Sequence, residues 1–552
     1  MKGVKAFWLS GIILLAGIHS CNLDYFDFDK LSTEVELTPS VAAPLAYGEF
    51  SIGDLVAAFD STGIVGTDSS GLLLISYRDT AYSVEASALI DFPDKVYDET
   101  YIDSDITGSA DWGSSAPGDT VRFYKLKEIN YTPDGGERLD SIILNAGDLV
   151  MDVTSSFHHA GYLVISSDYI LDPEGNKYVD TIKISSADGS FAFNDNYSMA
   201  DYSLHFLGKG NDSIYLPVDY ELFLINSGAG IGPGEECFIT MSFEQMDFRN
   251  VYGLIGQKEV LNEHIDLTID FYDVVADLAN IYFYDPQMNI YALNSYGVPV
   301  ELELRDVFAY SEAHGTTTQL TFTDGGIFSI DAPDIEAIGT TVESVFMVNR
   351  STSNIDEFLA SSPNQVYFDM VANTIETTTE NFLTDSSYLT LIVEVEMPMW
   401  LRSDGYTIRD TIEEINLEET LGGDLSFIEE ARLKLNTVNE WPLEVEIQVY
   451  FHDQDMNLID SLFADPLPVL AASNVNGDGE LLTPTAMQNL VVYSGSDLMN
   501  LKDARFIVFK AHAITSDDGT SYVKLLSDYK VKYDLSLQAD FRLTNDSFSS
   551  PQ

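Results

Sequence analysis

The residues best able to do chemistry in this chain are its eight histidines, two cysteines and 89 acidic residues. No His-Glu-x-x-His pattern occurs, and the adjacent pair His158-His159 cannot direct both rings to one face of a strand. A Gly-x-Ser-x-Gly elbow is absent, and the glycines of NSGAGIGPGEE lack the spacing of a phosphate-binding loop. We therefore predict no catalytic residue, no metal site and no cofactor.

Paired carboxylates are harder to exclude, because a glycosidase needs only two acids about 5 to 10 Å apart. With 89 acidic residues, many such pairs would arise in any fold. A glycoside hydrolase-like enzyme therefore stays as an alternative, although the sequence selects no particular pair. The main expectation is that the protein is not an enzyme.

The two cysteines lie in different settings. Cys21 follows a short basic head and an apolar run at 6–18, which is shorter than the roughly 20 residues of a membrane span. The tetrapeptide IHSC resembles a bacterial lipobox, which implies removal of residues 1–20 and lipidation of Cys21. Cys237 would then have no partner, and its alternating run ECFITMSF predicts a half-buried strand residue.

Charge and length limit the partners and the architecture. The formal net charge is −62, so the surface repels nucleic-acid phosphates, and we expect no nucleic-acid partner. Hydrophobic residues make up 45% of the chain and aromatic residues 12%, which is ample material for burial. Because 552 residues are too many for one core, we expect several domains.

Short β-type runs dominate the chain. One helix is expected in SIGDLVAAF, with Ser51 as its N-cap and Asp54 in the first turn. Elsewhere, runs such as TVRFYKL, GYLVISS and YELFLI are rich in β-branched and aromatic residues and are separated by Gly, Asn and Asp. The pattern predicts a mainly β protein, with several antiparallel β-sandwich (Ig-like) modules in tandem and a few short helices.

An internal repeat also indicates modules. NSYGVPVELEL (294–304) and NTVNEWPLEVEI (436–447) share Asn, a hydroxyl residue, a turn, Pro and a strand that alternates apolar residues with Glu. Aligned on their first residues, they match Asn294 with Asn436. Chance similarity between two amphipathic strands is the alternative.

These residues carry a resemblance to known families. The succession of strand, Asn, turn, Pro and strand resembles a β-sandwich module of the water-stress and late-embryogenesis type. The wider layout, with CN and an acidic segment after the anchor, resembles Bacteroidota outer-membrane lipoproteins of unknown function. The resemblance implies an outward-facing protein held in the outer membrane by lipid at Cys21, with envelope proteins or glycans as partners. It carries over no catalytic residue.

The predicted organisation runs along the chain in sequence order. It comprises a lipoprotein signal peptide (1–20), a lipidated tether (21–45), an N-terminal β-rich domain (46–150), three β-sandwiches (151–262, 263–390 and 391–542) and a tail (543–552).

Two functional hypotheses follow from these features. The first is a non-catalytic binding or scaffolding lipoprotein, accessory to an envelope complex. The second is a surface glycan-binding lipoprotein for polysaccharide uptake, because exposed aromatic side chains bind sugars. Trp112 in GSADWGSSAPG and Trp400 in MPMWLRSDGY lie in loop-like settings and are the predicted ligand-binding residues.

A further set of triplets, Asp-[Ser/Thr]-small or aliphatic, resembles the O-glycosylation sequon of Bacteroidota. An Asp that ends a turn before a β-favouring residue gives the same triplet for structural reasons, so both interpretations stay open. The predicted O-glycosylation residues are Ser61, Thr80, Thr120, Ser141, Thr181, Ser213, Thr411 and Ser461.

Overall fold

The predicted fold class is confirmed. The computed structural model describes residues 36–59, 64–86, 89–90, 94–131, 137–185, 188–208, 214–268, 281–312, 315–361, 363–412 and 427–543. Over these residues the protein is mainly β, with antiparallel sheets and only a few short helices. No helix within these ranges is long and apolar enough to cross a membrane.

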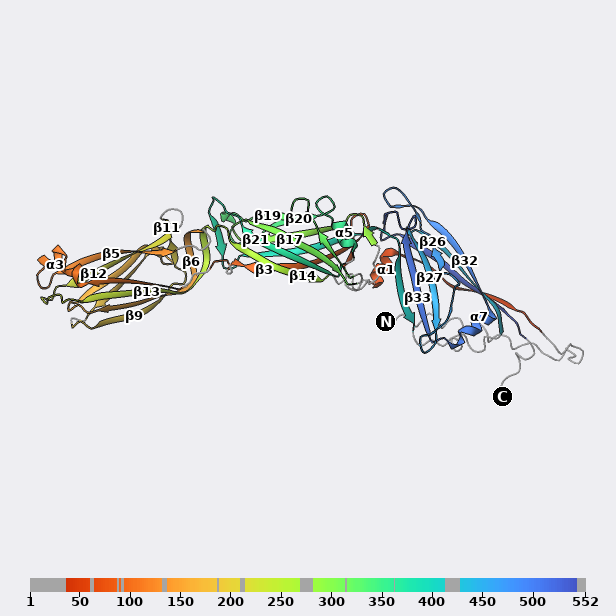
Figure 1. Ribbon diagram of the computed structural model, residues 1–552, viewed down its shortest axis with the longest axis horizontal. Helices are drawn as coiled ribbons and strands as arrows, with labels where there is room; N and C mark the ends of the chain where they lie inside the picture. Colours follow the sequence, from red (N-terminus) through yellow and green to blue (C-terminus); the bar gives the residue numbers. More distant parts are fainter. Residues whose placement is uncertain are drawn as a thin grey trace, which may run out of the picture.

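Three β-sandwich modules follow one another along the long axis of the molecule (Figure 1). We name them distal, middle and basal. The distal module contains β4 (Lys95–Ile102), α2 (Asp103–Thr107), α3 (Ala110–Ser114), β5 (Thr120–Tyr131), β6 (Arg138–Ser155), β7 (Gly161–Leu171), β8 (Lys177–Ile184), β9 (Phe191–Ser198), β10 (Ser203–His205), β11 (Leu207–Gly208), β12 (Ile214–Ile225) and β13 (Glu236–Leu254).

The other two modules are each assembled from separate parts of the chain. The middle module contains β2 (Val65–Thr67), β3 (Leu73–Glu85), β14 (Glu259–Thr268), β15 (Ile281–Phe283), β16 (Gln287–Asn294), β17 (Val300–Ser311), β18 (Thr316–Leu320), β19 (Ile327–Ile330), β20 (Val342–Val348), α5 (Ile355–Ala360), β21 (Gln365–Thr374), β22 (Asn381–Thr384) and β23 (Tyr388–Pro398). The basal module contains β1 (Ser40–Ser51), α1 (Ile52–Phe59), β24 (Trp400–Ser403), β25 (Tyr406–Ile412), β26 (Ile428–Asn439), β27 (Leu443–His452), β28 (Leu458–Ser461), β29 (Leu467–Leu470), β30 (Asn474–Val475), β31 (Leu481–Thr483), β32 (Thr485–Ser494), α7 (Gly495–Asn500), β33 (Phe506–Thr515), β34 (Val523–Lys524) and β35 (Lys530–Phe541).

All three modules share one strand order. In the first sheet of each module the first strand pairs with the last, giving β4-β13-β6-β9, β3-β23-β16-β20 and β1-β35-β26-β32. The second sheets run β5-β12-β7-β8, β14-β21-β17-β18 and β25-β33-β27-β28. The chain therefore contains three copies of one sandwich, of which the repeat at 294–304 and 436–447 marks two.

The modules are nested rather than strung in sequence order. The first strands appear along the chain as β1, β3 and β4, and the last strands appear in the reverse order as β13, β23 and β35. Each outer module is thus interrupted after its first strand by the whole of the next one. The domain borders predicted from the sequence did not include this nesting.

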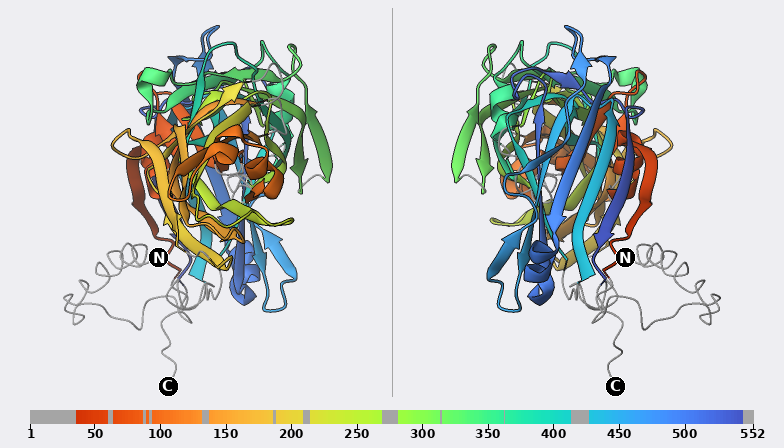
Figure 2. Two further views of the ribbon diagram at one scale, coloured as in Figure 1. Left: turned by 90° about the vertical axis from the view of Figure 1, so that its left-hand side faces the viewer. Right: turned by 90° about the vertical axis from the view of Figure 1, so that its right-hand side faces the viewer.

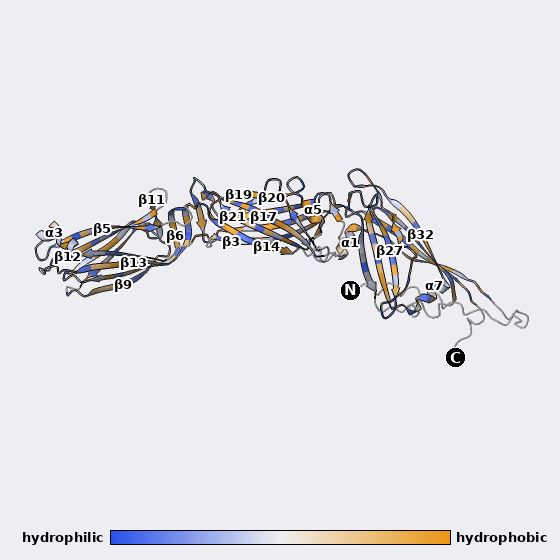
Figure 3. Cartoon of the chain, in the orientation of Figure 1, coloured by the Kyte–Doolittle hydropathy of each residue, from blue (hydrophilic) through white to orange (hydrophobic). Residues whose placement is uncertain are grey.

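One consequence of the nesting is that the first and last described strands lie side by side in the basal module (Figure 2, right). Glu49 of β1, for example, is paired with Lys532 of β35. The distal module occupies the opposite end of the molecule (Figure 1). Hydrophobic and hydrophilic residues alternate along many of the strands (Figure 3). The buried hydrophobic residues pack together as the core.

The repeated turn is held by a buried asparagine. In Asn294 and Asn439, both 0% exposed, Oδ1 accepts the main-chain N–H two residues ahead, from Tyr296 and Trp441, at 2.9 Å in each case. Nδ2 donates to the carbonyl oxygen four residues ahead, at 3.2 and 3.0 Å. The true counterpart of Asn294 is therefore Asn439. The sequence alignment matched Asn294 with Asn436 and was therefore wrong by three residues. Asn436 lies earlier in the same strand, β26.

The distal module carries a third copy of this turn. Ser155 Oγ accepts the N–H of Phe157, two residues ahead, at 3.3 Å, and Phe157 is fully buried. A serine and a phenylalanine thus replace the asparagine and the larger aromatic residue of the other modules. The helix predicted at 51–59 is also confirmed as α1, and Ser51 Oγ accepts the N–H of Asp54 at 3.0 Å.

Candidate functional site

The strongest candidate for a binding surface is the outer face of the sheet β5-β12-β7-β8 in the distal module. We call it the aromatic face. The rings of Tyr162 and Phe223, which are paired across β7 and β12, stack with their centroids 4.5 Å apart at 18°. Tyr124 on β5 lies one row further along and is 52% exposed. Leu126 and Val179 add exposed aliphatic side chains to the next row.

Charged groups on the aromatic face are paired with one another. Arg122 donates to both carboxylate oxygens of Glu221, at 3.0 and 2.6 Å, and this hydrogen bonding raises the pKa of Arg122. The hydroxyl of Tyr124 donates to Asp219 at 2.6 Å, which raises the pKa of Tyr124. Lys183 stands opposite Tyr162 on β8. In these three rows, two cations and two carboxylates balance each other on a strongly acidic chain. Glu128, opposite Pro217, adds a carboxylate in the next row.

This combination suits binding rather than bond breaking. Rings and aliphatic side chains offer apolar contact, while the adjoining guanidinium, ammonium and carboxylate groups offer hydrogen bonds. Glu221 and Asp219 are each engaged by a neighbour at hydrogen-bond distance. The face therefore presents an amphipathic, charge-balanced platform and no activated nucleophile.

Trp112, a predicted ligand-binding residue, lies in α3 at the far end of the distal module (Figure 1). Its main-chain N–H is capped by Ser109 Oγ at 3.4 Å. The half-buried indole packs against Phe123, with centroids 6.2 Å apart, and meets the ring of His159 at 4.8 Å and 81°. These contacts give Trp112 a packing role, and ligand binding by its ring stays a prediction.

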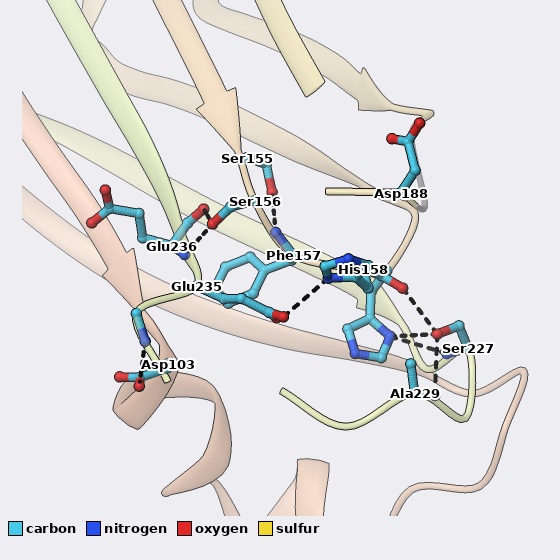
Figure 4. A network of polar contacts seen from close by, with 12 residues as sticks. Asp103, Ser155, Ser156, Phe157, His158, Asp188, Ser227, Ala229, Glu235 and Glu236 are labelled. Atoms are coloured by element: carbon cyan, nitrogen blue, oxygen red, sulfur yellow. Dashed lines mark hydrogen bonds and ion pairs between the residues drawn. The ribbon is translucent and has the colours of Figure 1, made fainter. Parts of the chain in front are cut away.

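The adjacent histidines hold two loops together at this end (Figure 4). His159 is fully buried, and its Nδ1 accepts the main-chain N–H of Ser227 at 3.1 Å. The Ser227 hydroxyl donates to the carbonyl oxygen of His158 at 3.0 Å, and His158 Nδ1 lies 3.0 Å from Glu235 Oε1. Because Nδ1 accepts a hydrogen bond, the His159 ring is neutral, and burial lowers its pKa. The Ser227 hydroxyl also lies 2.9 Å from His159 Nδ1, so these contacts tie the two loops together.

Trp400, the second predicted ligand-binding residue, lies at the joint between the middle and basal modules. Its indole stacks on Tyr284 with centroids 3.7 Å apart at 24°, and Lys524 Nζ lies 4.7 Å from the ring centroid. Trp400 belongs to β24, which pairs with β15 of the middle module and β34 of the basal module. The ring therefore stabilises a joint, and its predicted binding role has no contact that favours it.

The two joints are built alike. At the distal end of the middle module, the end of β13 pairs with β22, from Asn250–Thr384 to Gly253–Asn381. At the basal joint, β24 continues from β23 and pairs with β34. In each case the chain continues past the last strand of the inserted module's sandwich. It then pairs with the strand that comes just before the last strand of the module into which it is inserted. This pairing fixes each module to the next through main-chain hydrogen bonds.

The predicted modification residues are scattered over the modules. Cys21, Ser61 and Ser213 lie outside the described residues. In three triplets the Asp accepts the N–H of the hydroxyl residue that follows it, at 2.7 to 2.8 Å. These three triplets lie within β3, β8 and β28, so their Asp residues do not end a turn. The exposed hydroxyl residues are Thr80, Thr120, Thr181 and Thr411, and the partly buried ones are Ser141 and Ser461.

The remaining titratable residues of the part of the chain that the structure describes form no evident metal centre. Within it, no group of three or more His, Cys, Asp or Glu side chains could hold a metal ion. Cys237 is fully buried in β13, and burial raises the pKa of its thiol to about 12. It therefore behaves as a small hydrophobic residue, as its alternating run indicates.

The sequence reasoning missed Tyr124, Tyr162 and Phe223. Their runs TVRFYKL, GYLVISS and YELFLI were identified as strands, but alternation alone does not say which of two apolar faces is buried. The signal available was an aromatic residue at the outward positions of three strands that also carry a polar or charged residue there, such as Arg122 beside Tyr124 and Glu221 beside Phe223.

Comparisons with known proteins give no family. No protein-family model matches the chain, and neither does any curated protein. A protein of Parabacteroides distasonis described as secreted is 16% identical over 51% of this chain and 82% of its own, with a TM-score of 0.29. A chain of Sulfolobus turreted icosahedral virus is 13% identical over 80% of this chain and 96% of its own, with a TM-score of 0.12. A third match, from infectious bursal virus particles, is 10% identical over 77% and 71%, with a TM-score of 0.13. These scores are too low to carry an argument.

Proposed function

We propose that the protein is a lipid-anchored, non-catalytic binding protein of the outer membrane that holds its distal module away from the lipid. The observation that carries this proposal is the pairing of β1 with β35, which places the start of the described chain in the basal module. Cys21 precedes Ser40, the first residue of β1, by a tether of 18 intervening residues. Fully extended, such a tether reaches roughly 60 Å at most.

The nested architecture supports a role in display. The basal module contains β1, the first described strand, and the distal module occupies the other end of the row (Figure 1). Strand pairing at both joints favours a row that keeps its shape. A protein built in this way presents the aromatic face to the surroundings of the cell while the lipid holds the base.

The anchor is tested by substitution. Cys21→Ser should release the protein from membranes, because lipid on this residue is the proposed attachment. Cys237→Ser is the matched control, since this buried thiol takes no part in anchoring. If the Cys21→Ser protein still sediments with outer membranes after a high-salt wash, the anchoring proposal is wrong.

A second candidate function is glycan binding at the cell surface for polysaccharide uptake. The aromatic face favours it, because Tyr124 is exposed and the half-buried, stacked rings of Tyr162 and Phe223 lie near it on the same side of the sheet. The residues that would bind are then Tyr124, Tyr162 and Phe223, in place of the two tryptophans.

A further inference from the structure

We infer that the aromatic face binds a neutral polysaccharide, with Tyr124, Tyr162 and Phe223 as the surface on which the sugar rings pack. This inference rests on the proposed function, because it names the ligand class of the binding face that the anchored protein displays. The argument has three parts: where the aromatic side chains lie, which groups surround them, and what the charge of the chain excludes.

The aromatic side chains are gathered on one side of the distal module. The opposite sheet, β4-β13-β6-β9, has a polar row at the centre of its outer face, with Asp98 opposite Thr240, and Asp152 opposite both Thr240 and Asn194. The rows on either side carry the exposed Val96 and Phe238, and of these two Phe238 alone is aromatic. The two faces therefore differ in chemistry within one module.

The groups around the rings favour a sugar over a protein. The cores of protein interfaces are depleted of charged residues. Here the Arg122–Glu221 ion pair sits between the rings, with Arg122 opposite Phe223 and Glu221 opposite Tyr124. A pyranose ring has an apolar C–H face and a rim of hydroxyls, so its two kinds of surface match the two kinds of group present.

The negative charge of the protein favours neutral polysaccharides over acidic ones. The protein carries 89 acidic residues against 27 basic ones, and its field repels an approaching polyanion. The local cations do not reverse this field, because Arg122 is bound to Glu221 and Lys183 is a single further positive charge. A carboxylated or sulfated polysaccharide would have to displace that carboxylate, whereas a neutral one meets a surface whose charges are already balanced.

The extent of the face suits a linear chain. Its four strands lie about 4.8 Å apart, so the sheet is roughly 15 Å wide. Tyr124 lies on the strand next to Phe223 and one row away, a diagonal spacing of about 7 to 8 Å. The Tyr162–Phe223 stack and the Tyr124 ring thus lie within reach of a few successive sugars, with the Arg122–Glu221 pair between them.

The test is affinity electrophoresis of the full-length Cys21→Ser protein in native gels. The gels contain a neutral polysaccharide (soluble starch, xyloglucan or galactomannan) or an acidic one (alginate or polygalacturonate). We expect retardation by at least one neutral polymer and none by the acidic ones. In the triple variant Tyr124→Ala, Tyr162→Ala, Phe223→Ala, the association constant should fall at least tenfold.

Matched variants separate ligand contact from folding. Phe238→Ala, on the opposite face of the same module, should bind like the unmodified protein. Thermal melting shows whether the triple variant is folded. If it is not, the single variants Tyr124→Ala and Phe223→Ala are compared instead.

Three results would overturn the inference: no retardation by any of the neutral polymers, equal retardation of the triple variant and the unmodified protein, or retardation by the acidic polymers alone.

Crosslinking in native outer membranes distinguishes a protein ligand from a polysaccharide. If a crosslinked protein partner is lost from the triple variant while no neutral polymer binds, the face serves a protein, and the anchored binding function stands without the glycan. Failure of that function would appear separately, as Cys21→Ser protein that stays with the membrane.

Discussion

Asn439→Ala should destabilise the basal module, because this side chain holds the turn that joins its two sheets. Asn439 is fully buried at the end of β26. Its Nδ2 donates to the carbonyl oxygens of Trp441, Leu443 and Ala471 at 2.9, 3.0 and 2.8 Å, and its Oδ1 accepts the N–H of Trp441 at 2.9 Å. Alanine removes all four hydrogen bonds and adds none.

The magnitude follows from the groups left without partners. A buried N–H or carbonyl that loses its hydrogen bond costs about 1 to 3 kcal/mol. The Trp441 N–H is the main loss, and the carbonyl oxygens add to it, so we expect a decrease of about 3 kcal/mol in the free energy of unfolding. For a domain of this size that corresponds to a melting temperature lower by roughly 6 to 12 °C.

The assay is differential scanning calorimetry of the full chain, with Asn436→Ala as the matched control. Asn436 lies in the same strand, on the side of the sheet that carries the exposed Val438, so its loss should cost less than about 0.5 kcal/mol. The reasoning is refuted if Asn436→Ala destabilises the protein as much as Asn439→Ala, or if neither variant shifts the basal transition.

Three further predictions concern single side chains. His159 is buried as a neutral ring, and burial lowers its pKa, so the unfolded state binds the proton more readily. The contribution of the neutral ring to the free energy of unfolding should be fully present above pH of about 6.5 and should decrease as the pH falls below that value. The urea midpoint of the unmodified protein should therefore fall between pH 7.5 and 5.5, and in His159→Gln it should fall less. Cys237, whose thiol pKa is raised to about 12 by burial, should react with a thiol reagent at pH 8 only after denaturation; fast labelling of native Cys21→Ser protein would contradict its burial. Trp400→Ala removes the stack on Tyr284 and should cost about 2 to 4 kcal/mol at the basal joint. Small-angle X-ray scattering should then show a wider range of shapes, and an unchanged profile would mean that the strand pairing alone fixes the joint.

Part of this architecture could be predicted from the sequence. Period-2 alternation identified the strands, and the capping pair Ser51 and Asp54 identified α1, because both signals are local. The turn motif was found, but the choice between Asn436 and Asn439 needs the knowledge of which face of β26 is buried. Both residues are asparagines three positions apart, so the type of residue does not decide between them.

The nesting and the aromatic face depend on contacts that no local pattern records. β1 pairs with β35 although most of the chain separates them in sequence. The sequence of a strand does not indicate which distant strand will pair with it. Tyr162 and Phe223 each occupy a strand with apolar residues on both faces. Only the packing of β7 and β12 against the core shows which face turns outward, so the site could not be assembled from the sequence.

The distance of each module from the membrane tests the central claim most directly. In the lipidated protein on vesicles, a dye is attached to a cysteine introduced at Ser40, the first residue of β1, or at Ser114 in α3 of the distal module, while buried Cys237 stays unlabelled. Strands β6 and β23 alone add up to roughly 95 Å at about 3.3 Å per residue. Energy transfer to an acceptor in the lipid headgroups should be strong from position 40 and close to background from position 114. Equal transfer from both positions, or stronger transfer from position 114, would contradict the proposal that the base is anchored and the distal module is displayed.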